Sequence, residues 1–246
     1  MSYVDLHCHI LPGLDDGSRS LNETVRFARR LDAENVLDVA TTPHIKHTHH
    51  PFDVRTLAGL RKRVQAAISA EGLRVTLHQG GELAHEDALT LDPEELQLIA
   101  QGPESAPWLL LECPFNGLDD FFDAAVARLS GLGYGLLLAH PERAASELED
   151  TAPYTENGAL LQVNVSSLLG HHGPRARRLA NELVCDGRAY CLASDTHPGS
   201  REATLPQGLE ALRRLGVSEV RATRLTQTNP RFILREGVTQ LTPQHS

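Results

Sequence analysis

The sequence predicts a parallel, barrel-type α/β fold in a single domain over residues 1–246. Three observations predict it. Strand-like and helix-like segments alternate along the chain, seven such units fit into its length, and no linker rich in Gly, Ser or Pro divides them. In barrels of this kind the chemistry lies at the C-terminal ends of the strands, so functional side chains are expected there.

Seven short apolar segments are the expected strands. They are residues 4–10, 36–42, 73–77, 108–113, 135–139, 160–165 and 189–193. In the first of them, alternation places Asp5, His7 and His9 on one face. The opposite face then carries Val4, Leu6, Cys8 and Ile10. The segment is therefore expected to bury its apolar face and to direct imidazoles at something on the other side.

Helices are expected between the strands. Ser20 and Glu23 form a capping-box pattern that opens a helix through about residue 33. Further helices are expected over residues 53–71, 119–132 and 175–186. The tail from residue 205 to about 234 reads as helical, with a break at Asn229-Pro230.

Composition narrows the class of protein. The net charge of −9 disfavours nucleic acid as a partner, because binding to a phosphate backbone needs a basic surface. An anionic substrate must then be held by local charge. The chain shows no signal-peptide pattern and no apolar stretch long enough for membrane insertion, and its four cysteines lack C-x-x-C spacing. A cytoplasmic protein with reduced thiols is expected.

Imidazole or carboxylate groups follow six of the seven expected strands. The first strand carries His7 and His9, with Asp15 and Asp16 in the next loop. The sixth offers only Asn164 and Ser166. The other five are followed by His44, by Glu82, by Glu112, by His140 with Arg143 just after it, and by Asp195 with His197.

This pattern predicts a multinuclear metal site. Imidazole and carboxylate together suit zinc, iron and manganese. Because one zinc ion takes about four ligands, nine candidates indicate two or three ions, with a carboxylate such as Glu82 as a bridge. The nine candidates are His7, His9, Asp16, His44, Glu82, Glu112, His140, Asp195 and His197.

Each signal alone has a simpler interpretation. A lone H-x-H is often a polar strand, a lone Glu is often a capping group, and Asp15 or Asp16 could form an Asx-turn before Gly17. The run from His47 to His50 is expected to be a solvated loop. Four further histidines are not expected to be ligands: His78, His85, His171 and His172. Chance agreement at six strand ends is improbable, so the joint pattern favours the metal site.

Two other hydrolytic chemistries, a thiol phosphatase and a carbon–nitrogen hydrolase, each require residues at particular positions. A thiol phosphatase loop needs an Arg six residues after its Cys, and here those positions hold Leu14, Asp119, Cys191 and His197. A carbon–nitrogen hydrolase with a carboxylated lysine needs a Lys at a central strand end. Lys46 is expected in a loop and Lys62 in a helix. Glu82 or Glu112 could replace the lysine as the bridge, so this alternative stays open.

The motifs resemble those of a known superfamily. "DLHCHILPGLDDG", "TTPHI", "GGELA", "LLLECP", "LLAHPER" and "LASDTH" occur in the order seen in the polymerase-and-histidinol-phosphatase (PHP) superfamily. The chain looks most like the bacterial manganese-dependent protein tyrosine phosphatases of capsule and exopolysaccharide biosynthesis. The resemblance covers residues 3–235 and includes the late "NPRFIL" stretch.

The resemblance implies a distorted seven-stranded (β/α) TIM-like barrel with a trinuclear site on the nine candidate ligands. Manganese is the metal it favours, with iron, zinc and cobalt as alternatives. It places Arg143 and Arg201 as phosphate binders, and Asp16 and His197 beside them as catalytic groups. Ala144 replaces an aromatic residue of many relatives, and "GSREAT" around Arg201 departs from their Gly-Arg-x-Pro pattern.

The reaction expected from the resemblance is phosphoester hydrolysis by hydroxide that the metals activate, without a cysteine nucleophile. The expected substrate is a phosphotyrosine protein, such as a bacterial tyrosine kinase of polysaccharide synthesis. Two alternatives stay open beside it: a phosphatase for small phosphoesters such as histidinol phosphate, and a non-catalytic metal-binding scaffold.

Overall fold

The described strands form two parallel sheets. The computed structural model describes residues 1–46 and 51–238. One sheet has the order β1-β2-β4 and the other has the order β3-β5-β6-β7-β8-β9. The strands are β1 Tyr3–Cys8, β2 Val36–Thr41, β3 His44–Ile45, β4 Thr76–His78, β5 Glu82–Ala84, β6 Trp108–Glu112, β7 Gly135–Ala139, β8 Leu160–Asn164 and β9 Ala189–Ala193.

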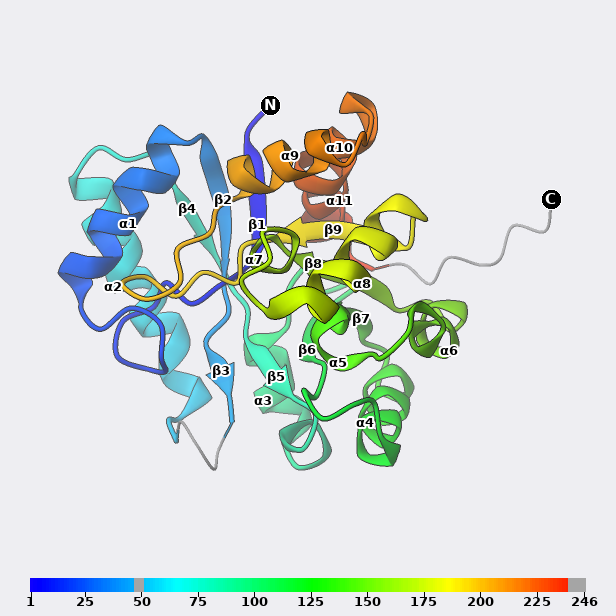
Figure 1. The fold of residues 1–246 in the computed structure, drawn as a ribbon. Coiled ribbons are helices and arrows are strands. Elements are labelled where there is room, and N and C mark those ends of the chain that lie inside the picture. The colour runs from blue at the N-terminus through cyan, green and yellow to red at the C-terminus, as the bar shows by residue number, and fades with distance from the viewer. Residues whose placement is uncertain (47–50, 239–246) are drawn as a thin grey trace.

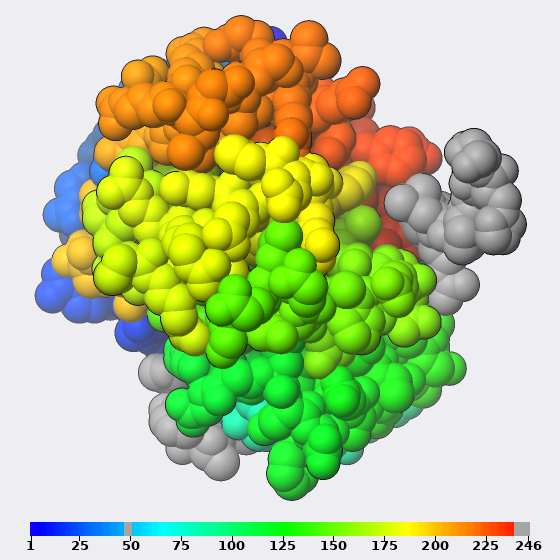
Figure 2. Space-filling model, turned by 45° about the vertical axis from the view of Figure 1, so that its right-hand side comes forward, coloured from blue at the N-terminus to red at the C-terminus, as the bar shows by residue number. Residues whose placement is uncertain are grey.

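Helices surround these strands (Figure 1). They are α1 Leu21–Ala33, α2 Leu57–Ala70, α3 Pro93–Ile99, α4 Asp120–Gly131, α5 Pro141–Ala144, α6 Ala152–Glu156, α7 Val165–Leu168, α8 Gly173–Cys185, α9 Leu205–Arg214, α10 Glu219–Thr223 and α11 Asn229–Glu236. Figure 2 shows α9 and α10 (orange) directly above α8 (yellow) on one face. Among the described residues, no helix is both long and apolar enough to span a membrane.

The expected α/β fold with parallel strands is confirmed, but a closed seven-stranded barrel is not. The segment expected at 36–42 ends at Thr41, and β3 follows it after Pro43, which cannot donate to a ladder. The segment expected at 73–77 is β4, shifted to Thr76–His78, and β5 is a separate strand. The two sheets meet where Cys8 pairs with Thr196.

Two glycines just before β5 let the chain approach the neighbouring strands closely. A Cβ on Gly81 would lie 2.9 Å from Ile45 Cγ1, and one on Gly80 would lie 3.1 Å from the Thr41 carbonyl oxygen. Larger residues would push β5 away from its neighbours. The "GG" before Glu82 therefore sets the position of that side chain.

The core lies on both faces of the strands. Along β6, Trp108 and Leu110 belong to one hydrophobic cluster, whereas Leu109 and Leu111 belong to another. Burial of both faces explains why this strand is a continuous apolar run. The Trp108 indole Nε1 donates to the Ile233 carbonyl at 2.8 Å and so ties α11 to the strands.

Strand β1 departs from the simple alternation that the sequence predicts. Its pairing with β2 shifts register between Tyr3 and Val4 and again between Asp5 and Cys8. As a result Leu6 and Cys8 pack in different hydrophobic clusters. The expectation that the apolar residues of 4–10 share one face is wrong, although both histidines of this segment are buried.

The expected helix from Ser20 to about residue 33 is confirmed as α1, whereas the expected break in the tail needs correction. Ser20 caps α1 by accepting from the Glu23 amide, but the Glu23 carboxylate accepts from the Arg19 amide, so only half of the capping box forms. The tail breaks between α9 and α10, not at Asn229-Pro230. At Asn229-Pro230 the chain stays helical, because a π-helical turn, Arg224–Thr228, leads directly into α11. This turn accommodates Pro230, which lacks an N–H.

Candidate metal centre

The nine predicted ligands lie together at one end of the strands. Their ligand atoms fall into four groups, and within each group these atoms lie within 4.8 Å of one another. Four residues are shared between two groups each, so the groups form one continuous cluster. The groups are His9, Asp16, His44 and His197; His7, His9 and Asp195; His7, Glu82 and His140; and His44, Glu82 and Glu112.

Glu82 occupies the centre of the cluster. Its Oε2 lies 2.8 Å from His44 Nδ1, 3.2 Å from His9 Nε2 and 3.3 Å from His7 Nε2. Its Oε1 lies 2.9 Å from His140 Nε2. Glu82 therefore contacts imidazoles from three strand regions. Glu82 was expected at the end of the third strand, but it is the first residue of the separate strand β5.

Asp195 approaches the same imidazoles from the end of β9. Its Oδ1 lies 3.5 Å from the Nε2 atoms of both His7 and His9. Its Oδ2 accepts a hydrogen bond from Asn164 Nδ2 at 2.7 Å. One carboxylate oxygen is thus anchored, and the other is directed into the cluster.

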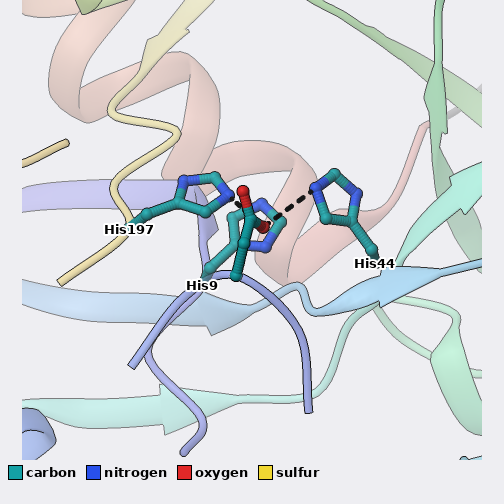
Figure 3. A group of neighbouring side chains, drawn as sticks. His9, His44 and His197 are labelled. Carbon is teal, nitrogen blue, oxygen red and sulfur yellow. Dashed lines mark ion pairs between the residues drawn. The ribbon is translucent and has the colours of Figure 1, made fainter. Parts of the chain in front are cut away.

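The outer group brings three imidazoles from distant segments together (Figure 3). Asp16 Oδ1 lies 3.1 Å from His197 Nε2 and 3.5 Å from His44 Nε2. The rings of His9 and His197 stack with centroids 3.8 Å apart. The Asp16 side chain is 48% exposed, so this group opens to solvent.

Glu112 ends β6 and forms an ion pair with a lysine. Its Oε2 lies 2.5 Å from Lys46 Nζ. Lys46 lies outside the strands, as expected, but it directly follows β3 and lines the pocket above the cluster. Strand β3 itself was not expected, because two residues are too few to show a strand period.

Two of the predicted ligands have left-handed backbone conformations. His140 has φ +39° and Asp195 has φ +50°. Residues other than glycine rarely adopt this region, and such strain gathers at functional sites. The conformation turns each side chain out of the strand alternation and toward the cluster.

Charge compensation shapes the pKa values here. Burial alone would raise the pKa of Glu82, but the nearby His7 and His44 hold it well below its usual value. Burial lowers the pKa of His7, yet the carboxylates of Glu82 and Asp195 raise it to about 9. For His140 burial dominates and lowers its pKa to about 4. Without metal, the cluster therefore holds the ionised Glu82 against a cationic His7, and a divalent cation bound there would displace that proton.

A second set of side chains orients the imidazoles. His9 Nδ1 donates to Asp15 Oδ2 at 2.7 Å, and His7 Nδ1 donates to Gln162 Oε1 at 3.0 Å. Both Nε2 atoms, 3.2 Å apart, therefore face the cluster, and in the neutral imidazoles these bonds fix the tautomer that leaves Nε2 free to bind a metal. Asp15 also makes the turn contact that was the simpler interpretation of this residue, since its Oδ1 accepts from the Gly17 amide.

Gln162 was missed by the sequence analysis. It shares a strand face with Asn164, to whose Oδ1 it donates at 2.7 Å. The amide pair connects His7 to Asp195. Gln162 and Asn164 stand two residues apart on the sixth expected strand, and this spacing was the sequence signal that could have indicated their shared face.

The donor set fits divalent cations. Among the described residues, Asp195 Oδ1 and Glu112 Oε1 are buried oxygens without a hydrogen-bond partner. An unsatisfied buried acceptor costs on the order of 1–3 kcal/mol, which a cation would offset. Nitrogen and oxygen donors without thiolate suit manganese, iron and zinc alike.

Both predicted arginines reach the rim of the cluster. Arg143 Nη1 lies 3.4 Å from Asp195 Oδ2. Arg201 Nη2 lies 2.8 Å from His197 Nε2, and its Nη1 lies 3.5 Å from Asp16 Oδ2. Both line a pocket of about 130 Å³ whose floor is formed by the cluster.

The other histidines of the described residues stand outside the four groups. His78 pairs with Asp38, His85 pairs with Glu86, and His172 Nδ1 lies 2.9 Å from Ser167 Oγ. His171 is exposed. The run 47–50 lies outside the described residues, so the expectation of a solvated loop stays a prediction.

Comparisons with known proteins give consistent results. The sequence model of a family described as capsular polysaccharide synthesis, CpsB/CapC, matches residues 3–235. CapC of Staphylococcus aureus, which is named as a tyrosine-protein phosphatase, is 29% identical over 197 residues, or 79% of this chain and 76% of that protein. The tyrosine-protein phosphatase YwqE of Bacillus subtilis strain 168 is 27% identical over 201 residues, or 79% of this chain and 77% of that protein.

Solved structures share the fold. A crystal structure from work on YwqE of Bacillus subtilis and CpsB of Streptococcus pneumoniae, described as unique metal-dependent tyrosine phosphatases, superposes with a TM-score of 0.78. It is 22% identical and covers 96% of this chain and 95% of its own. A dihydroorotase superposes with a TM-score of 0.58 at 12% identity, over 98% of this chain and 74% of its own. These likenesses establish the fold.

The raised pKa of His7 gives the metal-free protein a defined pH dependence. The group is protonated in the folded state up to about pH 9 but loses its proton near 6.5 when unfolded. The folded state then binds more protons, so stability falls as pH rises from 6.5 to 9, by on the order of 3 kcal/mol. Urea unfolding in chelator across this range measures it. His7→Gln should flatten the slope and the exposed His171→Gln should keep it; an unchanged slope in His7→Gln would contradict the assignment.

Asp15 is expected to control metal affinity without touching the metal. Asp15→Asn keeps the shape of the side chain and a hydrogen-bond acceptor for His9 Nδ1 but removes the negative charge. The His9 imidazole is then less basic and a weaker metal ligand. Loss of such a partner weakens metal binding by about 10–100-fold. Titration calorimetry with Mn²⁺ on chelator-treated protein measures the dissociation constant. Asp53→Asn, at an exposed cap, is the matched control. Equal affinities in both variants would rule out the orienting role.

Proposed function

This chain belongs to the capsular polysaccharide synthesis family CpsB/CapC, and we propose that it is a metal-dependent protein tyrosine phosphatase. One observation carries the proposal: a buried cluster of imidazoles and carboxylates lies directly beneath two guanidinium groups in one pocket. The names of CapC and YwqE support the same activity. The pattern suits a phosphate group placed between cations.

The proposed metal ligands are the nine residues of the cluster. They would hold two or three divalent ions, with Glu82 as a bridge because both of its oxygens face imidazoles from different strands. Manganese is the proposed metal, and iron, zinc and cobalt suit the same donors. When bound, such ions lower the pKa of water toward 7 and stabilise charge on phosphoryl oxygens.

The arginines supply the phosphate site. Arg143 and Arg201 both line the pocket, and each contacts a different carboxylate of the cluster, Asp195 and Asp16 respectively. A planar guanidinium can bind two phosphate oxygens at once, and its attraction grows as charge develops on them. The two side chains would orient the phosphoryl group above the cluster and stabilise the transition state.

Asp16 and His197 are the proposed proton-handling pair. The hydrogen bond with His197 is the main reason why the pKa of Asp16 is low. Asp16 therefore stays ionised near neutral pH, and a carboxylate with so low a pKa is suited to orient a proton donor and not to remove a proton. A strong general acid is less critical for a tyrosine substrate, because the phenol that leaves has a pKa of about 10.

The proposed substrate is a phosphotyrosine in a protein, with a bacterial tyrosine kinase of polysaccharide synthesis as the proposed partner. The test is chelator-sensitive phosphate release by the manganese-loaded protein from a phosphotyrosine peptide and from histidinol phosphate. Faster turnover of the peptide supports the proposal. Preference for histidinol phosphate would keep the metal site and replace the substrate. Release from neither substrate would favour a non-catalytic metal-binding scaffold.

Arg143 is expected to act on turnover and not on metal binding. Arg143→Ala should lower kcat/KM for the phosphotyrosine peptide by about 10²–10³-fold, because a donor to the developing charge is lost. Arg143→Lys should recover part of this, since it keeps the charge and loses the fork. Metal content by elemental analysis should not change. Arg74→Ala, at an exposed surface ion pair, is the control. Full activity in Arg143→Ala would refute the assignment.

A further inference from the structure

An exposed aromatic ring stands at the mouth of the pocket. Phe115 lies between β6 and α4 and is 48% exposed. It lines the pocket together with Arg143, Arg201 and Lys46. Single exposed apolar residues are common on protein surfaces. This one is unusual because of what it contacts.

The ring packs against groups of the candidate site. Arg143 Cζ lies 4.2 Å from its centroid, in cation–π geometry. The His140 ring is stacked with it at a centroid distance of 5.8 Å, and Lys46 Nζ lies 6.0 Å away. These contacts hold the ring at the pocket and leave about half of its surface to solvent.

We propose that Phe115 determines specificity by packing against the aromatic ring of an aryl phosphate substrate. This inference rests on the proposed phosphatase function and specifies its substrate class. A phosphate bound by Arg143 lies beside Phe115, because the guanidinium is already in contact with the phenyl ring. The group esterified to that phosphate then lies within reach of the exposed part of Phe115. Two aromatic rings attract each other beyond the burial of their area, and an alkyl group gains less.

A purely structural role for Phe115 makes a different prediction. If the ring served only to hold the guanidinium, its loss would weaken every phosphate ligand equally, including inorganic phosphate. If it contacts the substrate ring, only aryl ligands are affected. Inhibition by inorganic phosphate therefore separates the two roles.

The experiment compares wild type, Phe115→Ala and Phe115→Tyr in the manganese-loaded protein. Substrates are two peptides of one sequence that carry phosphotyrosine or phosphoserine. We expect Phe115→Ala to lower kcat/KM for the phosphotyrosine peptide about tenfold, mainly through KM, and for the phosphoserine peptide less than about twofold. Phe115→Tyr should restore the preference. Phe121→Ala, at a still more exposed aromatic residue that does not line the pocket, is the control.

A binding measurement keeps this test independent of turnover. Phenylphosphonate and methylphosphonate cannot be hydrolysed at the phosphorus–carbon bond, and calorimetry gives their affinities directly. Phe115→Ala should lose the preference for phenylphosphonate and keep its affinity for inorganic phosphate. Equal losses for all three ligands, or no loss, would overturn the inference. An inactive wild type that still prefers phenylphosphonate would refute the proposed function and leave the role of Phe115 standing.

Discussion

The burial of one carboxylate organises the upper end of this fold. Glu82 is fully buried, and an isolated carboxylate in such a place is strongly unfavourable unless positive charge surrounds it. The compensating imidazoles come from β1, β3 and β7, so the requirement connects both sheets at a single point. The glycines before Glu82 serve the same requirement, because they allow β5 to approach its neighbours closely. A cluster built in this way is most stable when cations replace the protons on its imidazoles.

Charge is divided between two levels of the site. The floor combines imidazoles with carboxylates and suits divalent cations, whereas the rim carries Arg143, Arg201 and Lys46 and suits phosphate. Each rim cation already contacts a carboxylate of the floor. This arrangement lets a chain with a net charge of −9 attract an anion, because the attraction acts locally inside a pocket and does not depend on the overall field.

The sequence revealed the parts of the site that carry their own chemistry. Imidazoles and carboxylates directly after apolar runs could be recognised singly, and parallel strand ends had to meet, so the cluster could be anticipated. What depends on tertiary contact could not. Strands β3 and β5 are too short to show a period, the register shifts in β1 leave no local signal, and the amides of Gln162 and Asn164 are common in strands of any function. The exposure of Phe115 beside Arg143 is likewise a property of the folded chain.

The rim also explains why phosphoester chemistry is favoured over carbon–nitrogen hydrolysis on a shared fold. The likeness to a dihydroorotase concerns the fold, and function resides in the site placed on it. A carboxylated lysine forms only from an uncharged amine. Of the two lysines, Lys62 is exposed on α2, and Lys46 forms an ion pair with Glu112 that raises its pKa against the effect of burial. Lys46 is thereby kept as an ammonium group, which binds anions and does not bridge cations. With two guanidinium groups beside it, this pocket is built to receive a phosphate.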